Sequence, residues 1–182
     1  FGPRQDPDGA YAAVIPKWIA AMLRGEPVYV NGDGETARDF CYIDNVVQVN
    51  LLAATVEDAA AVGEVYNVAL GEQTTLNELH ALLAEGLAAR IPGFTSAAPI
   101  YRDFRAGDVR YSRADVSKVQ RLLGFRPTHR IGEGLDEALD WYISRLRPVT
   151  NAAEGMVPSA GAVPAAVSNS PERMGHPFPA MD

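Results

Sequence analysis

Three charged side chains carry the most specific chemistry that this sequence predicts. Arg38 follows a glycine turn, while Arg105 and Asp108 lie close together much further along the chain. A guanidinium group pairs with two phosphate oxygens through its planar fork, and a carboxylate accepts hydrogen bonds from hydroxyl groups. The pattern predicts an anion clamp, in which Arg38 and Arg105 bind the two phosphates of a diphosphate and Asp108 binds sugar hydroxyls.

The segment 101–113 also has a simpler interpretation. It holds four arginines interleaved with aspartates, and exposed ion pairs of this kind contribute only about 0–1 kcal/mol each. The segment could then be a salt-bridged surface loop. Even within the clamp hypothesis, Arg102, Arg110 and Arg113 are expected to form ordinary surface pairs. Spacing alone leaves both interpretations open.

Other catalytic chemistries find little support. The three histidines, His80, His129 and His176, are far apart in the sequence and have no cysteine or carboxylate at ligand spacing. We therefore predict no metal site, with His80 and His176 exposed to solvent. The sequence contains no Gly-x-Ser-x-Gly elbow, and we interpret the glycines in 31–34 as a turn rather than a nucleotide-binding loop. No residue of this chain is predicted to be catalytic.

Composition limits the classes of molecule that this protein is expected to bind. The net charge of −7 argues against nucleic acid and against an acidic membrane surface. No apolar run approaches the roughly 18 residues of a membrane span, and no signal peptide is visible. Cys41, the single cysteine, lies in an apolar stretch and is expected to be a buried structural thiol. We expect a cytoplasmic protein, and the initial Phe suggests a piece of a longer one.

The elements that must position the charged residues follow from periodicity and capping signals. Residues 15–23 predict a helix, and 28–31 a strand that leads through the turn into a second strand at 38–42. Asp44 is expected to cap a helix over 45–55, and the capping box of Thr75 and Glu78 begins another. The remaining expected elements are strands at 65–69 and 99–101, a short helix that Asp115 or Ser117 caps and that ends at Gly124, and a last helix at about 132–146.

This order predicts an α/β fold with too few strands for a complete doubly wound sheet. The strand at 65–69 is expected to be the last strand of a parallel sheet whose other members are absent. From residue 148 onward the composition changes to Pro, Ala, Gly, Ser and Met without any period. We therefore predict one folded portion over residues 1–147, followed by a disordered low-complexity tail over 148–182.

Several motifs together resemble the extended short-chain dehydrogenase/reductases of the NAD-dependent epimerase/dehydratase family. The resemblance implies the C-terminal part of an extended Rossmann-type fold: a substrate-binding subdomain plus the last elements of the parallel sheet. The opening residues 1–18 resemble the bacterial UDP-N-acetylglucosamine 4-epimerases of surface-polysaccharide synthesis. The matching motifs are Arg38-Asp39-Phe40-x-Tyr42-Ile43-Asp44, Val65-Tyr66-Asn67-Val68, Arg105-Ala106-Gly107-Asp108 and Leu122-Leu123-Gly124-Phe125.

In such epimerases NAD takes a hydride from C4 of the sugar and returns it to the other face. The resemblance implies a UDP-sugar ligand, a homodimeric parent and NAD held mainly by an N-terminal half. It also implies which residues bind the nucleotide: Arg38 and Arg105 contact the diphosphate, and Asp108 contacts the ribose. The backbone of Tyr29 and Asn31 contacts the uracil, and Trp18 packs beside it. The N–H near Val14 lies at a helix start, Gln5 lies near the N-acetyl sugar, and Ser112 lies close to the clamp.

The family's glycine-rich loop and Tyr-x-x-x-Lys pair would precede Phe1, so this chain alone is expected to be inactive. Two alternatives stay open. One is a different nucleotide-sugar epimerase, decarboxylase or dehydratase of the same family. The other is a non-catalytic fragment that binds nucleotide sugars.

Overall fold

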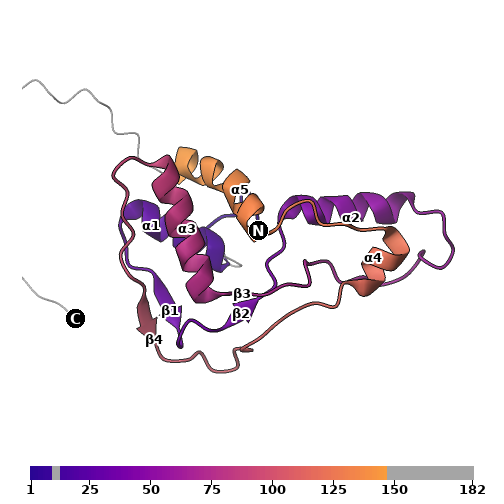
Figure 1. Ribbon diagram of the computed structural model, residues 1–182, viewed down its shortest axis with the longest axis horizontal. Coiled ribbons are helices and arrows are strands. Elements are labelled where there is room, and N and C mark those ends of the chain that lie inside the picture. Colours follow the sequence, from indigo (N-terminus) through magenta and orange to yellow (C-terminus); the bar gives the residue numbers. More distant parts are fainter. Residues whose placement is uncertain (10–12, 147–182) are drawn as a thin grey trace, which may run out of the picture. The chain divides into compact units, whose positions relative to one another are not determined.

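The computed structural model describes residues 1–9 and 13–146 (Figure 1), so the predicted tail over 148–182 lies outside the described residues. Helices and short strands alternate along the chain, as expected for an α/β protein. The elements in order are α1 (Val14–Arg24), β1 (Tyr29–Asn31), β2 (Ala37–Arg38), α2 (Ile43–Thr55), β3 (Thr74–Thr75), α3 (Leu76–Arg90), β4 (Ile100–Arg102), α4 (Ser117–Leu123) and α5 (Ile131–Leu146).

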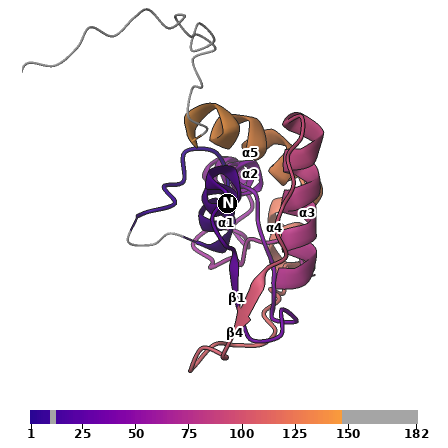
Figure 2. The ribbon, with the colours of Figure 1, turned by 90° about the vertical axis from the view of Figure 1, so that its left-hand side faces the viewer.

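The main core lies where α1, α3 and α5 pack against one another (Figures 1 and 2). Apolar residues at helical spacing make this possible: Ile19 of α1, Leu79 and Leu83 of α3 and Leu139 of α5 are almost completely buried. Each such side chain contributes about 1.5–3 kcal/mol when it leaves water. The predicted capping box begins α3, because the Thr75 hydroxyl accepts from the backbone N–H of Glu78 at 3.1 Å.

Strands that follow one another in the sequence, β1 and β2, do not pair with each other. β1 runs parallel to β4, with Val30 opposite Tyr101, whereas β2 is antiparallel to β3. The turn between β1 and β2 is therefore not a hairpin. Its Gly34 has φ +81°, and a Cβ there would overlap the side-chain oxygen of Asn77 at the start of α3. Glycine is required because the turn packs directly on that helix.

The predicted second strand over 38–42 is too long, because strand pairing ends at Arg38. The next residue, Asp39, points its carboxylate at the backbone of two other segments. It accepts hydrogen bonds from the N–H groups of Leu70 at 3.0 Å, Gly71 at 2.9 Å and Ala114 at 3.2 Å. Asp39 thus replaces ladder pairing with side-chain hydrogen bonds and fixes the segments before β3 and before α4.

A second, smaller core lies between α2 and α4 and buries residues such as Val49, Val119 and Phe125. The helix α2 begins at Ile43, and its N-cap residue Tyr42 makes no side-chain capping bond. The prediction that Asp44 caps this helix is therefore wrong. Asp44 lies inside the first turn, where a negative charge still interacts favourably with the helix dipole.

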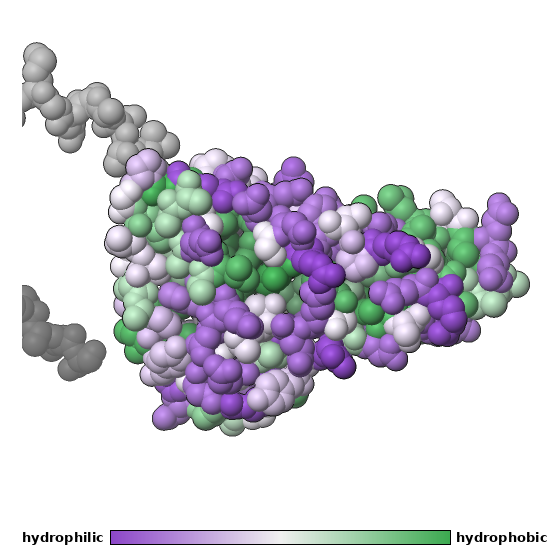
Figure 3. All heavy atoms as spheres, in the orientation of Figure 1, coloured by the Kyte–Doolittle hydropathy of each residue, from purple (hydrophilic) through white to green (hydrophobic). Residues whose placement is uncertain are grey.

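Residues 65–69 do not form the predicted strand. They pair with no other strand among the described residues, and the Val65 side chain is 84% exposed. Apolar patches lie among polar ones on the α2 side of the molecule (Figure 3), and Val47 and Leu51 of α2 and Val62 after it are each more than two-fifths exposed. A strand requires a neighbour for its backbone groups, and the described part of the chain supplies none here.

Asn45 is the polar residue that connects α2 to the chain before α5. It is completely buried; its Nδ2 donates to the carbonyl of His129 at 2.7 Å, and its Oδ1 accepts from the N–H of Thr128 at 2.8 Å. Because these bonds join the buried Asn45 side chain to backbone groups more than 80 positions away, Asn45 holds the second core against the rest of the fold.

We expect Asn45→Ala to lower the free energy of unfolding by about 2–3 kcal/mol, because it removes the hydrogen bonds that a completely buried side chain makes to the backbone of Thr128 and His129. Urea unfolding monitored by circular dichroism measures this. The matched control is Asn50→Ala on the same helix, whose side chain is exposed and bonds only to its own turn. The control should change stability by less than about 0.5 kcal/mol. Equal losses in the two variants would contradict this role for Asn45.

Candidate functional site

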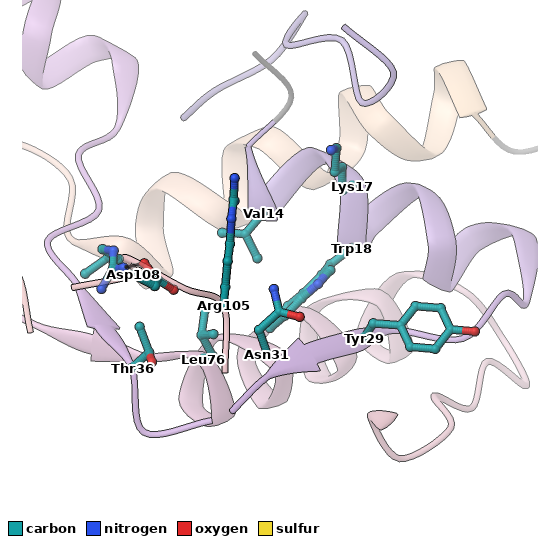
Figure 4. Close-up of a pocket in the computed structure, with 10 residues that line it drawn as sticks. Val14, Lys17, Trp18, Tyr29, Asn31, Thr36, Leu76, Arg105 and Asp108 are labelled. Carbon is teal, nitrogen blue, oxygen red and sulfur yellow. Dashed lines mark hydrogen bonds and ion pairs between the residues drawn. The ribbon is translucent and has the colours of Figure 1, made fainter. Parts of the chain in front are cut away.

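A pocket of about 310 Å³ opens between α1, β1, β2 and the segment after β4 (Figure 4). Its volume lies at the lower end of the range typical of small-molecule sites. Seven of the nine residues that the sequence analysis singled out line it, together with three that it did not. The lining residues are Val14, Lys17, Trp18, Tyr29, Asn31, Thr36, Arg38, Leu76, Arg105 and Asp108.

A short ladder brings Arg38 and Asp108 together although they are 70 positions apart. The Ala37 N–H donates to the Arg110 carbonyl at 2.8 Å, and the Ser112 N–H donates to the Ala37 carbonyl at 3.2 Å. This parallel bridge places the loop before Ser112 beside the side chain of Arg38. The Arg38 guanidinium then forms an ion pair with the Asp108 carboxylate.

Arg105 reaches the same pocket from the segment after β4. Figure 4 shows its side chain extending toward Val14 at the start of α1, and it has no carboxylate partner among residues 1–9 and 13–146. With Arg38 and Lys17 it makes three cationic side chains in the lining, against the single carboxylate of Asp108. Formal charges leave the pocket with an excess of about two positive charges, which favours a ligand with two negative charges.

One face of α1 forms another wall. Val14, Lys17 and Trp18 are spaced by three and four residues, so they project from the same side of the helix. Among the described residues no side chain caps the helix start, and its first turn holds no acidic residue. Its N–H groups therefore add to the positive potential of the wall. Trp18 is only 7% exposed, and it contributes apolar surface at the boundary between core and pocket.

Lys17, Thr36 and Leu76 were missed by the sequence analysis. A signal for Lys17 existed, because Val14 and Trp18 together define a helical face that includes it. Thr36 and Leu76 gave no comparable signal. They meet because the Leu76 N–H donates to the Thr36 carbonyl at 3.0 Å, next to the pairing of β2 with β3.

Two predicted residues do not line this pocket. Gln5 lies in a separate hollow formed by residues 1–5 and Ile43, and its carbonyl accepts from the Tyr142 hydroxyl at 3.2 Å. That bond holds the opening loop against α5. Ser112 contributes its backbone to the ladder beside Arg38, and its side chain is absent from the lining.

The three arginines expected to form surface pairs differ in outcome, and Arg113 has no ion-pair partner among the described residues. Arg110 pairs with Asp33 at 2.7 Å, the ordinary surface pair that was expected. Arg102 instead stacks over the Tyr29 ring, 3.3 Å from its centroid, so the expectation of a charged partner is wrong for it. The Tyr29 ring points away from Arg105 and Asp108 (Figure 4), which leaves the backbone of β1 facing the pocket.

The histidines differ from expectation. His80 is half-buried against the edge of Trp18 and is not solvent-exposed, and burial lowers its pKa. His129 does have carboxylate neighbours, because the fold brings ligand atoms of Asp44, His129 and Glu137 within 4.8 Å of one another. Its Nε2 lies 3.0 Å from the Glu137 carboxylate, which also accepts from the Tyr42 hydroxyl at 3.1 Å. These hydrogen bonds account for the cluster as a structural link.

Cys41 is half-buried and free, and its thiol donates weakly to the Tyr42 carbonyl. Burial raises the pKa of the thiol, which disfavours the reactive thiolate. The structural role expected for this cysteine is consistent with that environment.

The described residues do not fit a complete dinucleotide site. The glycines after β1 are followed by β2, whereas a nucleotide-binding glycine loop opens a helix. The interpretation of 31–34 as a turn is therefore confirmed. Among residues 1–9 and 13–146 no other strand, glycine loop and helix occur in that order, so NAD chemistry cannot be assigned to side chains of this part.

Comparison with known proteins gives a consistent family. Residues 1–69 match the NAD dependent epimerase/dehydratase family. A UDP-glucose 4-epimerase from Mycolicibacterium smegmatis is 32% identical over 78% of this chain and 42% of its own length. The structure of a Thermotoga maritima UDP-glucose 4-epimerase with UDP-glucose is similar with a TM-score of 0.70 and 40% identity, covering 80% of this chain and 44% of that one.

The UDP-N-acetylglucosamine 4-epimerase from Methanobrevibacter ruminantium, solved with UDP-N-acetylmuramic acid, has a TM-score of 0.68 and 39% identity, covering 79% of this chain and 43% of that one. Dehydratases and a decarboxylase acting on nucleotide sugars also match, and some of the similar structures contain NAD. The chain spans less than half the length of these relatives.

The chain resembles members of the NAD-dependent epimerase/dehydratase family over about four-fifths of its length, and some of the similar structures contain NAD. Its fold is the C-terminal part of an extended Rossmann-type short-chain dehydrogenase/reductase, as the sequence predicted. None of the helices in the described part of the chain has the length and apolar character needed to cross a membrane.

The Glu137 link predicts a pH-dependent contribution to stability. Hydrogen bonds from His129 and then Tyr42 lower the pKa of Glu137 in the folded state. Its contribution is therefore present above the unfolded pKa of about 4.3 and is lost as the pH falls through the folded value. We expect Glu137→Gln to be less stable than wild type at pH 7, with the difference shrinking below about pH 4.3.

Urea unfolding at pH 7, 5 and 4 measures this difference. The control is Glu85→Gln, an exposed residue of α3, for which the difference from wild type should not vary with pH. A Glu137→Gln deficit of constant size across the three pH values would contradict the assignment.

Proposed function

We propose that the described residues form the UDP-sugar-binding portion of a nucleotide-sugar 4-epimerase. The observation that carries the proposal is the convergence of Arg38 and Arg105 on one pocket with an excess of positive charge, bounded by β1 and the start of α1. A diphosphate supplies the two negative charges that this lining favours.

The proposed roles are those that the resemblance implies, and the positions of most of these residues in one pocket support them. Arg38 and Arg105 bind the two phosphates, and the uncapped N–H groups near Val14 add a further anion contact. Asp108 accepts hydrogen bonds from the ribose hydroxyls. The backbone of Tyr29 and Asn31 faces the uracil ring, with Trp18 packing beside it. Gln5 is assigned to the N-acetyl sugar and Ser112 to the neighbourhood of the clamp by resemblance alone.

The reaction that we propose for the whole protein is interconversion of UDP-N-acetylglucosamine and UDP-N-acetylgalactosamine, in surface-polysaccharide synthesis. The similarity to the Methanobrevibacter ruminantium UDP-N-acetylglucosamine 4-epimerase, at 39% identity, supports this choice. NAD supplies hydride transfer at C4 when it is bound. The residues of this chain bind and orient the UDP group, which positions the sugar without taking part in the transfer. A dimeric assembly in the cytoplasm is part of the proposal.

UDP-glucose 4-epimerase is the second candidate. The Thermotoga maritima UDP-glucose 4-epimerase is 40% identical to this chain and equally similar in structure. The described pocket faces the nucleotide, so it favours neither sugar. A non-catalytic nucleotide-sugar-binding protein remains the alternative from a different class.

The clamp is tested by the affinity for UDP. We expect Arg105→Ala to weaken UDP binding about 10- to 100-fold, because a charge-assisted hydrogen bond to phosphate contributes about 1.5–3 kcal/mol. Isothermal titration calorimetry on the 182-residue chain measures this. Arg110→Ala is the matched control, since Arg110 pairs with Asp33 and is absent from the pocket lining. Equal losses in both variants would remove Arg105 from the clamp.

The reaction is tested on the complete gene product. We expect it to carry bound NAD and to interconvert the two UDP-N-acetylhexosamines faster than UDP-glucose and UDP-galactose. Coupled chromatography of the sugar nucleotides measures the rates. Faster turnover of UDP-glucose would favour the second candidate. A gene without a glycine-rich loop and a Tyr-x-x-x-Lys pair upstream of Phe1 would leave only the binding function.

A further inference from the structure

The two arginines of the clamp are not equivalent in this structure. The Arg38 guanidinium already pairs with Asp108 and donates to the Ala37 carbonyl at 2.8 Å and the Arg110 carbonyl at 3.5 Å. Arg105 has no such partner among the described residues. A bare anion can therefore approach Arg105 directly. At Arg38 it would have to compete with the Asp108 carboxylate for the guanidinium donors.

The Asp108 carboxylate is placed so that it can change partners. The side chains of Arg38 and Asp108 are 29% and 35% exposed, and both line the pocket. Asp108 follows Gly107, which has φ +78°, and apart from its chain neighbours no described residue comes within 4 Å of where a Cβ would lie. The whole segment from Asp103 to Arg110 is exposed, so this loop has room to adjust.

The cost of displacing Asp108 depends on what the ligand offers in return. Phosphate or pyrophosphate takes the Arg38 donor and leaves Asp108 beside a second anion, with no new hydrogen bond for its carboxylate. A nucleoside diphosphate brings ribose hydroxyls, which donate to that carboxylate while the phosphates take the arginine. Only the second exchange keeps every charged group paired.

We propose that Asp108 is a specificity-determining residue that guards Arg38 against bare phosphate anions and yields to a diphosphate that carries a sugar diol. The inference rests on the proposed function, which it deepens by assigning selectivity to one carboxylate. The Asp108 carboxylate would repel a bare phosphate anion and accept hydrogen bonds from a sugar diol. Combining repulsion of one ligand with attraction of another is a common basis of specificity.

The experiment compares pyrophosphate and UDP by isothermal titration calorimetry on the 182-residue chain. In wild type we expect pyrophosphate to bind at least tenfold more weakly than UDP. Asp108→Asn should bind pyrophosphate about tenfold more tightly than wild type, with no gain for UDP. The ratio of UDP to pyrophosphate affinity then falls at least tenfold. UDP lacking both ribose hydroxyls keeps its uracil and phosphate contacts but offers no donor to Asp108, so it should bind wild type about tenfold more weakly than UDP and should not share that loss in Asp108→Asn.

Asp33→Asn is the matched control. Asp33 is also a carboxylate paired with an arginine, Arg110, but neither residue lines the pocket. Like Asp108→Asn, the Asp33→Asn variant removes one negative charge near an arginine, so it corrects for a general gain in anion affinity. Its affinity ratio should equal that of wild type. Circular dichroism verifies that both variants are folded.

The outcomes separate this inference from the proposed function. Wild type that binds UDP, with an unchanged ratio in Asp108→Asn, would overturn the inference and leave the proposed function standing. An equal change of ratio in Asp33→Asn would also overturn it. Absence of UDP binding in wild type would contradict the proposed function, and with it the selectivity proposed here.

Discussion

The backbone pairing of Ala37 is the constraint on which the site depends. Ala37 pairs with Thr75 on one side through β2 and β3, and with Tyr111 on the other through a parallel bridge. The start of α3 and the loop that carries Asp108 are thereby held on either side of the strand from which Arg38 projects. Asp39 reinforces the junction through bonds to backbone groups near Gly71 and Ala114. A few hydrogen bonds thus assemble residues that are distant in the sequence.

The site also shows how local charge differs from overall charge. The chain has a net charge of −7, yet its pocket gathers Lys17, Arg38 and Arg105 with one carboxylate. Neighbouring charges act over short distances in salt solution, so the lining rather than the total decides which ligand is favoured. The N–H groups at the start of α1 add to the same field beyond the charge of Lys17.

The two cores differ in how completely they are covered. Helices α1, α3 and α5 enclose the main core, whereas α2 exposes Val47 and Leu51, and residues 65–69 remain unpaired among the described residues. The relatives are more than twice as long as the matched region. The unpaired backbone of residues 65–69 and the exposed apolar side chains of α2 lie on the less covered of the two cores.

The sequence by itself determined the features that depend on local physics. The helices, the capping box at Thr75 and the turn at Gly34 follow from periodicity, hydrogen bonding of neighbouring residues and backbone freedom. Motif order also identified the family and most of the pocket lining. Only the tertiary structure decided which strands pair, where Asp39 directs its carboxylate, and that His129 meets Glu137. These are contacts between distant segments of the chain. Their energies depend on which residues the fold brings together, and a local sequence pattern does not specify that.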